Sequence, residues 1–272
     1  MDLFADEKIP ESFLMEESFS HVANAYDRNF THTSIGLKQR QQIHKSVLAL
    51  LNRKMSVLEI NGGTGEDALF LAAHCDSVLT TDISPEMLSI AKAKTAHLQN
   101  VETLVLDITK LEGTMDIQYD LIFSNFGGLN CLSPRELNNF MSTALNLLAP
   151  KGFLIAVIMG RKTLWERFYF WIKKDYQESK RRRNKSAVET NVERKKVSTW
   201  YYSPQEIEAM SPKSLRLVQL KPIGLFVPPS YLQTYFKNKS NTLAFLHFMD
   251  GFFGRFWSDY ADHYCICYHR NE

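Results

Sequence analysis

Three polar side chains that could hold a ligand, Asp82, Asp107 and Asn125, each follow a short apolar run. Another apolar run leads into a glycine-rich turn at residues 61–65. A carboxylate such as Asp82 can accept hydrogen bonds from both hydroxyls of a ribose. Glycines let the backbone take positive φ and approach a ligand closely, and the free N–H groups of a following helix favour an anionic or polar group. These residue types therefore predict a site for a ligand that carries a ribose.

A parallel sheet is the element that could bring these side chains together. Runs of β-branched and apolar residues predict five strands, at 57–60, 78–81, 101–106, 119–123 and 153–159. Helical patterns separate them, and one helix begins with Ser84 as N-cap and Pro85 at its first position. Alternation of strands and helices predicts parallel pairing, and the carboxyl ends of parallel strands meet along one crevice. We therefore expect an α/β fold with Asp82, Asp107 and Asn125 in that crevice.

The order and spacing of these motifs resemble those of class I S-adenosylmethionine-dependent methyltransferases. The matching elements are the glycine-rich turn, Asp82 after the second strand, Asp107 after the third, the segment at 120–125, and residues 148–152 before the fifth strand. The resemblance implies a seven-stranded Rossmann-like sheet with helices on both faces, N-terminal helices, and a lid-type insertion after the fifth strand.

The resemblance also implies the cofactor, S-adenosylmethionine, and the residues that bind it. The glycine-rich turn passes under its amino-acid part, where Glu59 could anchor the turn or the ammonium group. Asp82 holds the ribose, Asp107 accepts from the adenine amino group, and the methyl group faces its acceptor at Asn125 and Phe126. The implied cofactor-binding residues are Tyr26, Arg40, Glu59, Asn61, Gly62, Gly63, Thr64, Gly65, Asp82, Ile83, Met87, Asp107, Ile108, Asn125 and Phe126. The sequence shows no metal-ligand constellation of the kind that catechol-type methyltransferases use.

One position departs from the family pattern. The first glycine of the turn is replaced by Asn61. Asn is the residue after glycine that most readily adopts left-handed backbone geometry. We therefore expect the shape of the turn to be kept.

The chain divides into four predicted parts. They are a helical cap over the cofactor at 1–55, the cofactor-binding core at 56–160, a basic lid or insertion at 161–212, and the completion of the sheet at 213–272. Residues 161–196 hold 13 Lys/Arg against 5 Asp/Glu, a net charge of +8. A solvated loop, a contact to an acidic substrate or carrier, and a contact to an anionic membrane surface are the three interpretations of this charge.

The C-terminal part contains an unusually aromatic stretch at 241–257, which reads as a helix that is apolar on nearly every side. Such a helix is buried, lines a pocket or makes a dimer contact, and we expect core packing. Residues 263–268 alternate and predict a last, antiparallel strand. Cys265 and Cys267 then face the same way, which indicates packing rather than metal binding.

Composition limits the remaining possibilities. The net charge of +2 over 272 residues does not favour nucleic acid as a partner. Four scattered cysteines favour free thiols in a reducing cytoplasm. No apolar run reaches the roughly 18 residues that a membrane-spanning helix needs. A homodimer remains open.

Together these features predict transfer of a methyl group to an oxygen, nitrogen or carbon atom of a small metabolite that is aromatic, lipophilic or acidic. His32 and Tyr231 are the candidates for a catalytic base. One alternative is an NAD(P)-dependent oxidoreductase, because Gly63, Gly65, Ala68 and Asp82 also fit that fingerprint. A non-catalytic S-adenosylmethionine-binding protein and an RNA or protein methyltransferase that uses the basic insertion are the others.

Overall fold

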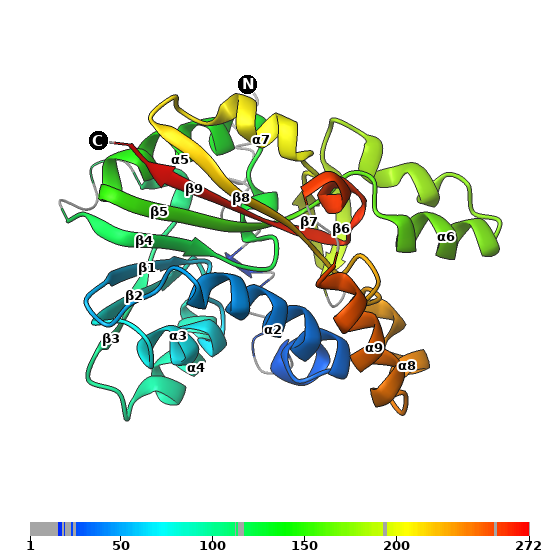
Figure 1. Cartoon of the computed structure of the whole chain (residues 1–272), viewed down its shortest axis with the longest axis horizontal. Coiled ribbons are helices and arrows are strands. Elements are labelled where there is room, and N and C mark those ends of the chain that lie inside the picture. Colours follow the sequence, from blue (N-terminus) through cyan, green and yellow to red (C-terminus); the bar gives the residue numbers. More distant parts are fainter. Residues whose placement is uncertain are drawn as a thin grey trace, which may run out of the picture.

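A single seven-stranded sheet forms the centre of the molecule, as the computed structural model in Figure 1 shows. The structure describes residues 26–271 apart from 112, 114–116, 193–194 and 253–254, together with Glu16, Glu17, Phe19 and Ala23. The strands of this sheet are β1 (Ser56–Ile60), β2 (Ser77–Asp82), β3 (Val101–Val105), β4 (Tyr119–Ser124), β5 (Leu148–Met159), β8 (Leu215–Ile223) and β9 (His263–Arg270). Their order is β3-β2-β1-β4-β5-β9-β8.

The pairing of the strands confirms the sheet that the resemblance implied. The pairings among the first five strands are all parallel, with β1 between β2 and β4. The last strand, β9, is antiparallel to both β5 and β8. Cys265 and Cys267 lie on β9 and are fully buried, so their expected packing role is confirmed. The parallel arrangement places the ends of β1, β2, β3 and β4 at the same edge.

Helices cover both faces of the sheet. The helical segments are η1 (Asp27–Thr31), α2 (Ser34–Leu48), α3 (Glu66–Ala72), α4 (Pro85–Thr95), η2 (Ile108–Lys110), η3 (Gly128–Cys131), α5 (Pro134–Leu147), α6 (Leu164–Ile172), η4 (Glu178–Arg183), α7 (Pro204–Met210), η5 (Ser230–Leu232), α8 (Gln233–Phe236), α9 (Ser240–Asp250) and η6 (Arg255–Tyr260). One apolar cluster joins α2 and α3 to the sheet, and another joins α5 and α7 to its other face. Most of residues 1–25 lies outside the described part, so the expected N-terminal helices are described only from η1 onward.

Local sequence fixes where several of these helices begin. Ser84 accepts a hydrogen bond from the backbone N–H of Met87, and proline follows it at the first helical position of α4. Ser133 and Ser203 each form a capping box with a glutamate three residues later, at the starts of α5 and α7. Each cap satisfies N–H groups that the first helical turn leaves unpaired. The predicted start at Ser84 is confirmed.

The segment after β5 forms a separate lobe. Helix α6 and the short η4 are followed by a hairpin of two antiparallel strands, β6 (Val188–Val192) and β7 (Lys195–Thr199), which do not join the main sheet. Figure 1 shows α6 and the pair α8 and α9 at the same end of the molecule. In the described part of the chain, no helix combines the length and the apolar character that crossing a bilayer requires.

The expectation of core packing for the aromatic stretch at 241–257 is wrong. Phe245, Phe248 and Phe252 are more than half exposed, and Phe256 is almost fully exposed. Only Leu243 of this helix is a fully buried apolar residue, in a small cluster with Ile35 and Val227. A helix packed on one side can bury one stripe, and the aromatic residues occupy the remainder of α9.

Candidate functional site

A cavity of about 270 Å³ lies at the carboxyl ends of the parallel strands. Its wall includes residues that directly follow or end β1, β2, β3, β4 and β5. The lining residues are Phe19, Tyr26, Asn61, Gly63, Asp82, Ile83, Met87, Asp107, Ile108, Thr109, Asn125, Phe126, Gly127, Gly128, Cys131, Leu132, Met159, Thr190, Val197 and Thr199. Ten of the fifteen residues expected to bind the cofactor are in this set.

The glycine-rich turn keeps the shape that the sequence predicted. Asn61 has a φ of 56°, in the left-handed region, and Gly63 and Gly65 also have positive φ. A Cβ atom on Gly65 would lie 2.8 Å from the Cβ of Ala91, so glycine is needed for α3 to approach α4. The replacement of the first glycine by Asn61 therefore leaves the turn intact.

Asn61 also has a specific neighbour across the cavity. A Cβ atom on Gly128 would lie 2.4 Å from Asn61 Nδ2 and 2.6 Å from its Cβ, so the asparagine side chain fills the space beside this glycine. Asn61 Nδ2 is buried and makes no hydrogen bond to any residue that the structure describes. A buried amide donor without a partner is costly. The cavity wall therefore offers an unused donor at the turn.

Asp82 and Asp107 are both held in place by backbone amides. Asp82 accepts hydrogen bonds from Gly63 N–H and Ser84 N–H, each at 2.9 Å, and its burial raises its pKa. Asp107 accepts from the backbone N–H and the hydroxyl of Thr109, at 3.0 and 2.7 Å. Burial alone would raise the pKa of Asp107, but the hydrogen bonds from Thr109 lower it overall. The two carboxyls are thus oriented before any ligand binds.

Asp67, which the sequence analysis did not single out, is a buried carboxylate that binds three other side chains beneath the cavity. Arg40 forms an ion pair with it, and His44 and Asn125 bond to it at 2.6 and 2.7 Å. Burial alone would raise the pKa of Asp67, but the Arg40 guanidinium and His44 hold it below its usual range. The hydrogen bond to Asp67 fixes the side chain of Asn125 at the end of β4.

Asn125 in turn supports a strained neighbour. Phe126 has a φ of 45°, which costs a bulky residue about 1–3 kcal/mol. Its N–H donates to Asn125 Oδ1 at 2.8 Å, the Arg40 guanidinium lies 4.8 Å from its ring, and Phe30 packs edge-on against it. Surrounding contacts therefore hold the Phe126 ring on the cavity wall.

Five expected cofactor-binding residues lie behind the wall rather than on it. Arg40 is committed to Asp67, and Gly65 packs against α4. The Thr64 hydroxyl donates to Asp27 at 2.6 Å. Glu59 is buried below Gly62, since a Cβ atom on that glycine would lie 2.9 Å from Glu59 Oε2. The structure brings these residues next to the site but not onto its surface.

The two candidate bases are not on the cavity wall. His32 is largely exposed and lies 3.4 Å from Glu66. Tyr231 is half-exposed and its ring packs on Tyr169, with 5.3 Å between ring centroids. The loop after two prolines therefore presents Tyr231 to helix α6 and not to the cavity.

A group of possible metal ligands within the described residues is already occupied. Asp27, His32 and Glu66 have ligand atoms close to one another. The ammonium of Lys94 lies 2.5 Å from Asp27 and 2.6 Å from Glu66. A lysine between two carboxylates takes the place that a cation would need. This group ties the N-terminal segment to the glycine-rich turn.

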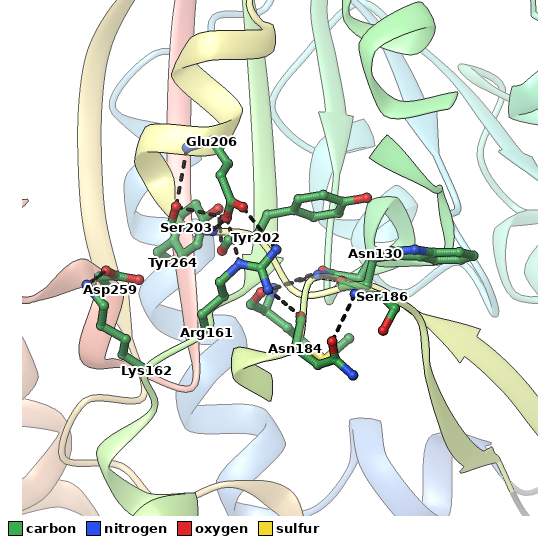
Figure 2. A network of polar contacts seen from close by, with 12 residues as sticks. Asn130, Arg161, Lys162, Asn184, Ser186, Tyr202, Ser203, Glu206, Asp259 and Tyr264 are labelled. Carbon is green, nitrogen blue, oxygen red and sulfur yellow. Dashed lines mark hydrogen bonds and ion pairs between the residues drawn. The ribbon is translucent and has the colours of Figure 1, made fainter. Parts of the chain in front are cut away.

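The hairpin of β6 and β7 closes the cavity from a direction that the sequence did not reveal. Thr190, Val197 and Thr199 come from this hairpin. Asn130 positions its base, because its side-chain amide donates to Trp200 O at 2.6 Å and to Met159 O and accepts from Met159 N–H at 2.9 Å. Figure 2 draws Asn130 in the same close-up as Asn184 and Tyr202. Its buried amide fastens the end of β7 to the end of β5.

Three arginines of the insertion are held in ion pairs with buried or half-buried acids. Arg161 forms a two-pronged ion pair with Glu206, at 2.7 and 3.0 Å, and also donates to Asn184 O (Figure 2). Arg182 is buried between Glu166 and Asp262, at 2.6 and 3.0 Å, and Arg181 bonds to Glu166. A freely solvated loop therefore does not describe this basic run.

Sequence comparisons agree with this geometry. Residues 57–152 match the family model described as "Methyltransferase domain". The chain is 31% identical over 135 residues to a non-reducing polyketide synthase, prhL, of Penicillium brasilianum, covering 46% of this chain and 5% of that protein. It is 28% identical over 137 residues to demethylmenaquinone methyltransferase of Clavibacter sepedonicus, covering 50% and 54%. The chain thus spans only about half, or much less, of the length of these curated relatives.

A solved structure with the same fold covers nearly the whole chain. The complex of DhpI with SAH superposes with a TM-score of 0.59 at 16% identity, over 97% of this chain and 99% of that one. The five motifs, the sheet order and the family match point to the same conclusion. The chain is built on a class I S-adenosylmethionine-dependent methyltransferase domain.

Proposed function

We propose that this chain transfers a methyl group from S-adenosylmethionine to a small aromatic or lipophilic acceptor. The observation that carries the proposal is the cavity itself. Its wall carries the oriented carboxyls of Asp82 and Asp107 as well as apolar groups such as Phe126, Met159 and Val197. A polar end suits a nucleoside and an apolar end suits a small organic acceptor.

The residues at the polar end fit the cofactor. Asp82 keeps its carboxyl at the end of β2, where the two hydroxyls of a ribose can donate to it. Asn61 Nδ2 is a buried donor without a partner, and an oxygen atom of the ligand would satisfy it. Ile83, Met87 and Ile108 provide flat apolar contact for an adenine.

When bound, the cofactor supplies a sulfonium methyl group that is already electrophilic. The chain therefore has to orient the acceptor and exclude water. Among the described residues that line the cavity, the ionisable ones are Tyr26, Asp82, Asp107 and Cys131. Burial raises the pKa of Tyr26 and of Cys131 to about 12, so both stay protonated at neutral pH. We infer that the acceptor enters as a nucleophile that needs no protein base.

The hairpin of β6 and β7 acts in this proposal as the lid over the acceptor end. Thr190, Val197 and Thr199 cover the apolar end, and the hairpin belongs to neither the core sheet nor its helices. These lid residues are small, and the hydroxyls of Thr190 and Thr199 bond to each other at 2.7 Å, so the lid favours an uncharged ring or chain over a nucleic acid base or a protein. The paired arginines of the insertion favour the same choice, because Arg181 and Arg182 are taken up by the protein itself.

Calorimetric titration of the full chain tests the cofactor. We expect micromolar binding of S-adenosylmethionine and of its demethylated product, and none of NAD(H). Asp82→Ala should abolish binding, because it removes the acceptor of the ribose hydroxyls. Asp76→Ala is the matched control, since Asp76 is an exposed acid just before the same strand. Binding of NAD(H) instead would refute the proposal in favour of an oxidoreductase.

A second experiment tests the acceptor end. Val197→Phe enlarges a buried side chain of the cavity wall, whereas Ser198→Phe places the same ring on the opposite face of β7. Product formation is followed by mass spectrometry with phenols, amines and lipophilic ring compounds as acceptors. Val197→Phe should lower turnover of the larger acceptors and leave cofactor affinity unchanged. Tight cofactor binding without turnover of any acceptor would favour a non-catalytic binding protein.

A further inference from the structure

Two helices expose an apolar face that the fold does not cover. On α6, Leu164, Phe168, Trp171 and Ile172 recur at helical spacing, and Phe168 and Trp171 are 55% and 60% exposed. On α9 and just beyond it, Phe245, Phe248 and Phe252 are 61%, 61% and 69% exposed. Scattered exposed apolar residues are ordinary, but rows of large ones on adjoining elements mark an interaction surface.

The two rows belong to one region, which we call the aromatic surface. It is defined by the exposed apolar residues of segments 164–174 and 231–252. Contacts between the segments join them, because Trp165 packs edge-on against Phe236 and Tyr169 packs against Tyr231. Figure 1 shows α6, α8 and α9 at the same end of the molecule.

The charges around the aromatic surface are predominantly positive, with the exposed Asp175 beside Lys174 as an acid at its edge. Its exposed ionic residues are Arg167, Lys173, Lys174, Lys237 and Lys239. The two acids within these segments, Glu166 and Asp250, are both buried. Glu166 is paired with Arg181 and Arg182, and Asp250 accepts hydrogen bonds from backbone N–H groups of the loop before η5. The solvent-facing side of both segments is therefore aromatic and cationic.

We propose that the aromatic surface binds the surface of a bilayer that contains anionic lipids. Aromatic side chains settle at the boundary between headgroups and acyl chains, and lysines beside them are attracted to anionic headgroups. The alternative occupant, a second copy of this chain, would bring two sets of lysines together, because a twofold interface pairs the same patch with itself. Charge complementarity thus favours the lipid surface.

A hollow at the edge of the aromatic surface supports this choice. It has a volume of about 550 Å³ and lies between α2, β8 and α9. Lys45, Lys221 and His247 contribute to its wall, together with the rings of Phe248 and Phe252, against one acid, Asp250. Burial is the main cause that lowers the pKa of His247, and the nearby charges of Lys38 and Lys45 lower it further. A cationic hollow beside exposed aromatic rings suits a lipid phosphate.

The aromatic surface is connected to the active cavity through the lid. Four residues separate the end of β5 from the start of α6, and the Trp165 indole N–H donates to Phe226 O at 3.1 Å. The same insertion continues into the hairpin that lines the cavity. Docking of this end on a bilayer would bring the lid close to lipophilic molecules dissolved there. Lipid binding itself does not depend on the proposed methyl transfer.

Co-sedimentation of the full chain with vesicles tests the inference. We expect binding to phosphatidylcholine vesicles that contain roughly 30% phosphatidylglycerol, and weak or no binding to pure phosphatidylcholine. Raising the salt from about 0.1 M to about 1 M should weaken binding, because the Debye length falls from about 10 Å to about 3 Å. Equal binding to both vesicles, or to neither, would overturn the proposal.

Matched variants then locate the surface. Lys174→Glu with Lys237→Glu should weaken binding by more than about 25-fold, since each lysine contributes about fivefold. Phe168→Ser with Phe248→Ser should weaken it by roughly tenfold or more. Lys54→Glu with Lys92→Glu and Ile117→Ser change exposed residues elsewhere and should leave binding unchanged. Sedimentation velocity is run in parallel. A dimer that Phe168→Ser with Phe248→Ser dissociates, together with no vesicle binding by the wild type, would overturn the proposal and show that a second copy covers the surface.

Discussion

Glu59 gives the sharpest test of the geometry beneath the cofactor site. Its carboxyl is 1% exposed at the end of β1, below Gly62. Burial, and then the nearby charge of Asp67, raise the pKa of Glu59 from 4.5 to about 8. In the free protein the carboxyl is therefore mostly protonated at pH 7, whereas in the unfolded chain it is ionised.

This difference makes the stability depend on pH with a definite sign. Because the folded-state pKa is the higher one, the native state holds the proton more tightly between the two values. The resulting stabilisation is complete below about pH 4.5 and is lost as the pH rises through about 8. One proton contributes at most about 1.4 kcal/mol per pH unit, or roughly 2–3 kcal/mol between pH 5 and pH 7.

Glu59→Gln keeps the shape of the side chain and removes the titration. The free energy of unfolding, measured with urea at pH 5, 6 and 7 through tryptophan fluorescence, should fall more steeply with pH in the wild type than in the variant. Glu102→Gln removes an exposed carboxyl from β3 and controls for the change in net charge. If the wild type and Glu59→Gln follow parallel curves, the carboxyl is not buried in the way we describe.

The same group also reports on the cofactor. If Glu59 lies near the cationic amino-acid end of bound S-adenosylmethionine, its pKa falls on binding and a proton is released at pH 7. Calorimetry in two buffers with different ionisation enthalpies measures this proton directly. We expect a release approaching one proton for the wild type and none for Glu59→Gln. Identical proton release in both proteins would mean that the cofactor lies elsewhere or that another group titrates.

Three further substitutions test other parts of the structure by thermal or urea unfolding. Gly128→Ala should destabilise by about 1–3 kcal/mol because its Cβ overlaps Asn61, and adding Asn61→Gly should restore most of the loss through a positive coupling. Asn130→Ala should cost about 1–3 kcal/mol for each backbone group of Met159 and Trp200 that it leaves unpaired. Arg182→Met should cost about 3–5 kcal/mol, since it leaves the carboxylates on either side buried without their shared cation.

The sheet and the shape of the glycine-rich turn could be predicted because their signals are local. Strand, turn and helix follow one another within a few residues around the turn at 61–65. Asn61 keeps the left-handed geometry of the turn because asparagine adopts it more readily than other residues apart from glycine. Asp82 ends its strand in the sequence as in the structure. Such positions depend mainly on the order of elements along the chain.

The deeper layer of the site could not be predicted in the same way. Asp67 stands in the first turn of α3, where an acid is expected for its effect on the helix dipole alone. Its partners Arg40, His44 and Asn125 are 27, 23 and 58 residues away in the sequence, and only the packed fold brings them to one carboxylate. The hairpin over the cavity was missed for a related reason, because neither of its polar strands carries an apolar pattern of its own.

Helix α9 shows why apolar content alone does not place a helix. One stripe, with Leu243 and Leu246, packs on Ile35, Phe236 and Val227. The sheet face below is already covered by α2, so no further core is available to the aromatic residues on the other sides of α9. Their exposure follows from the number of layers in the fold and not from their chemistry. A partner that covers these aromatic residues must therefore come from outside this core, and the neighbouring Lys237 and Lys239 favour an anionic surface.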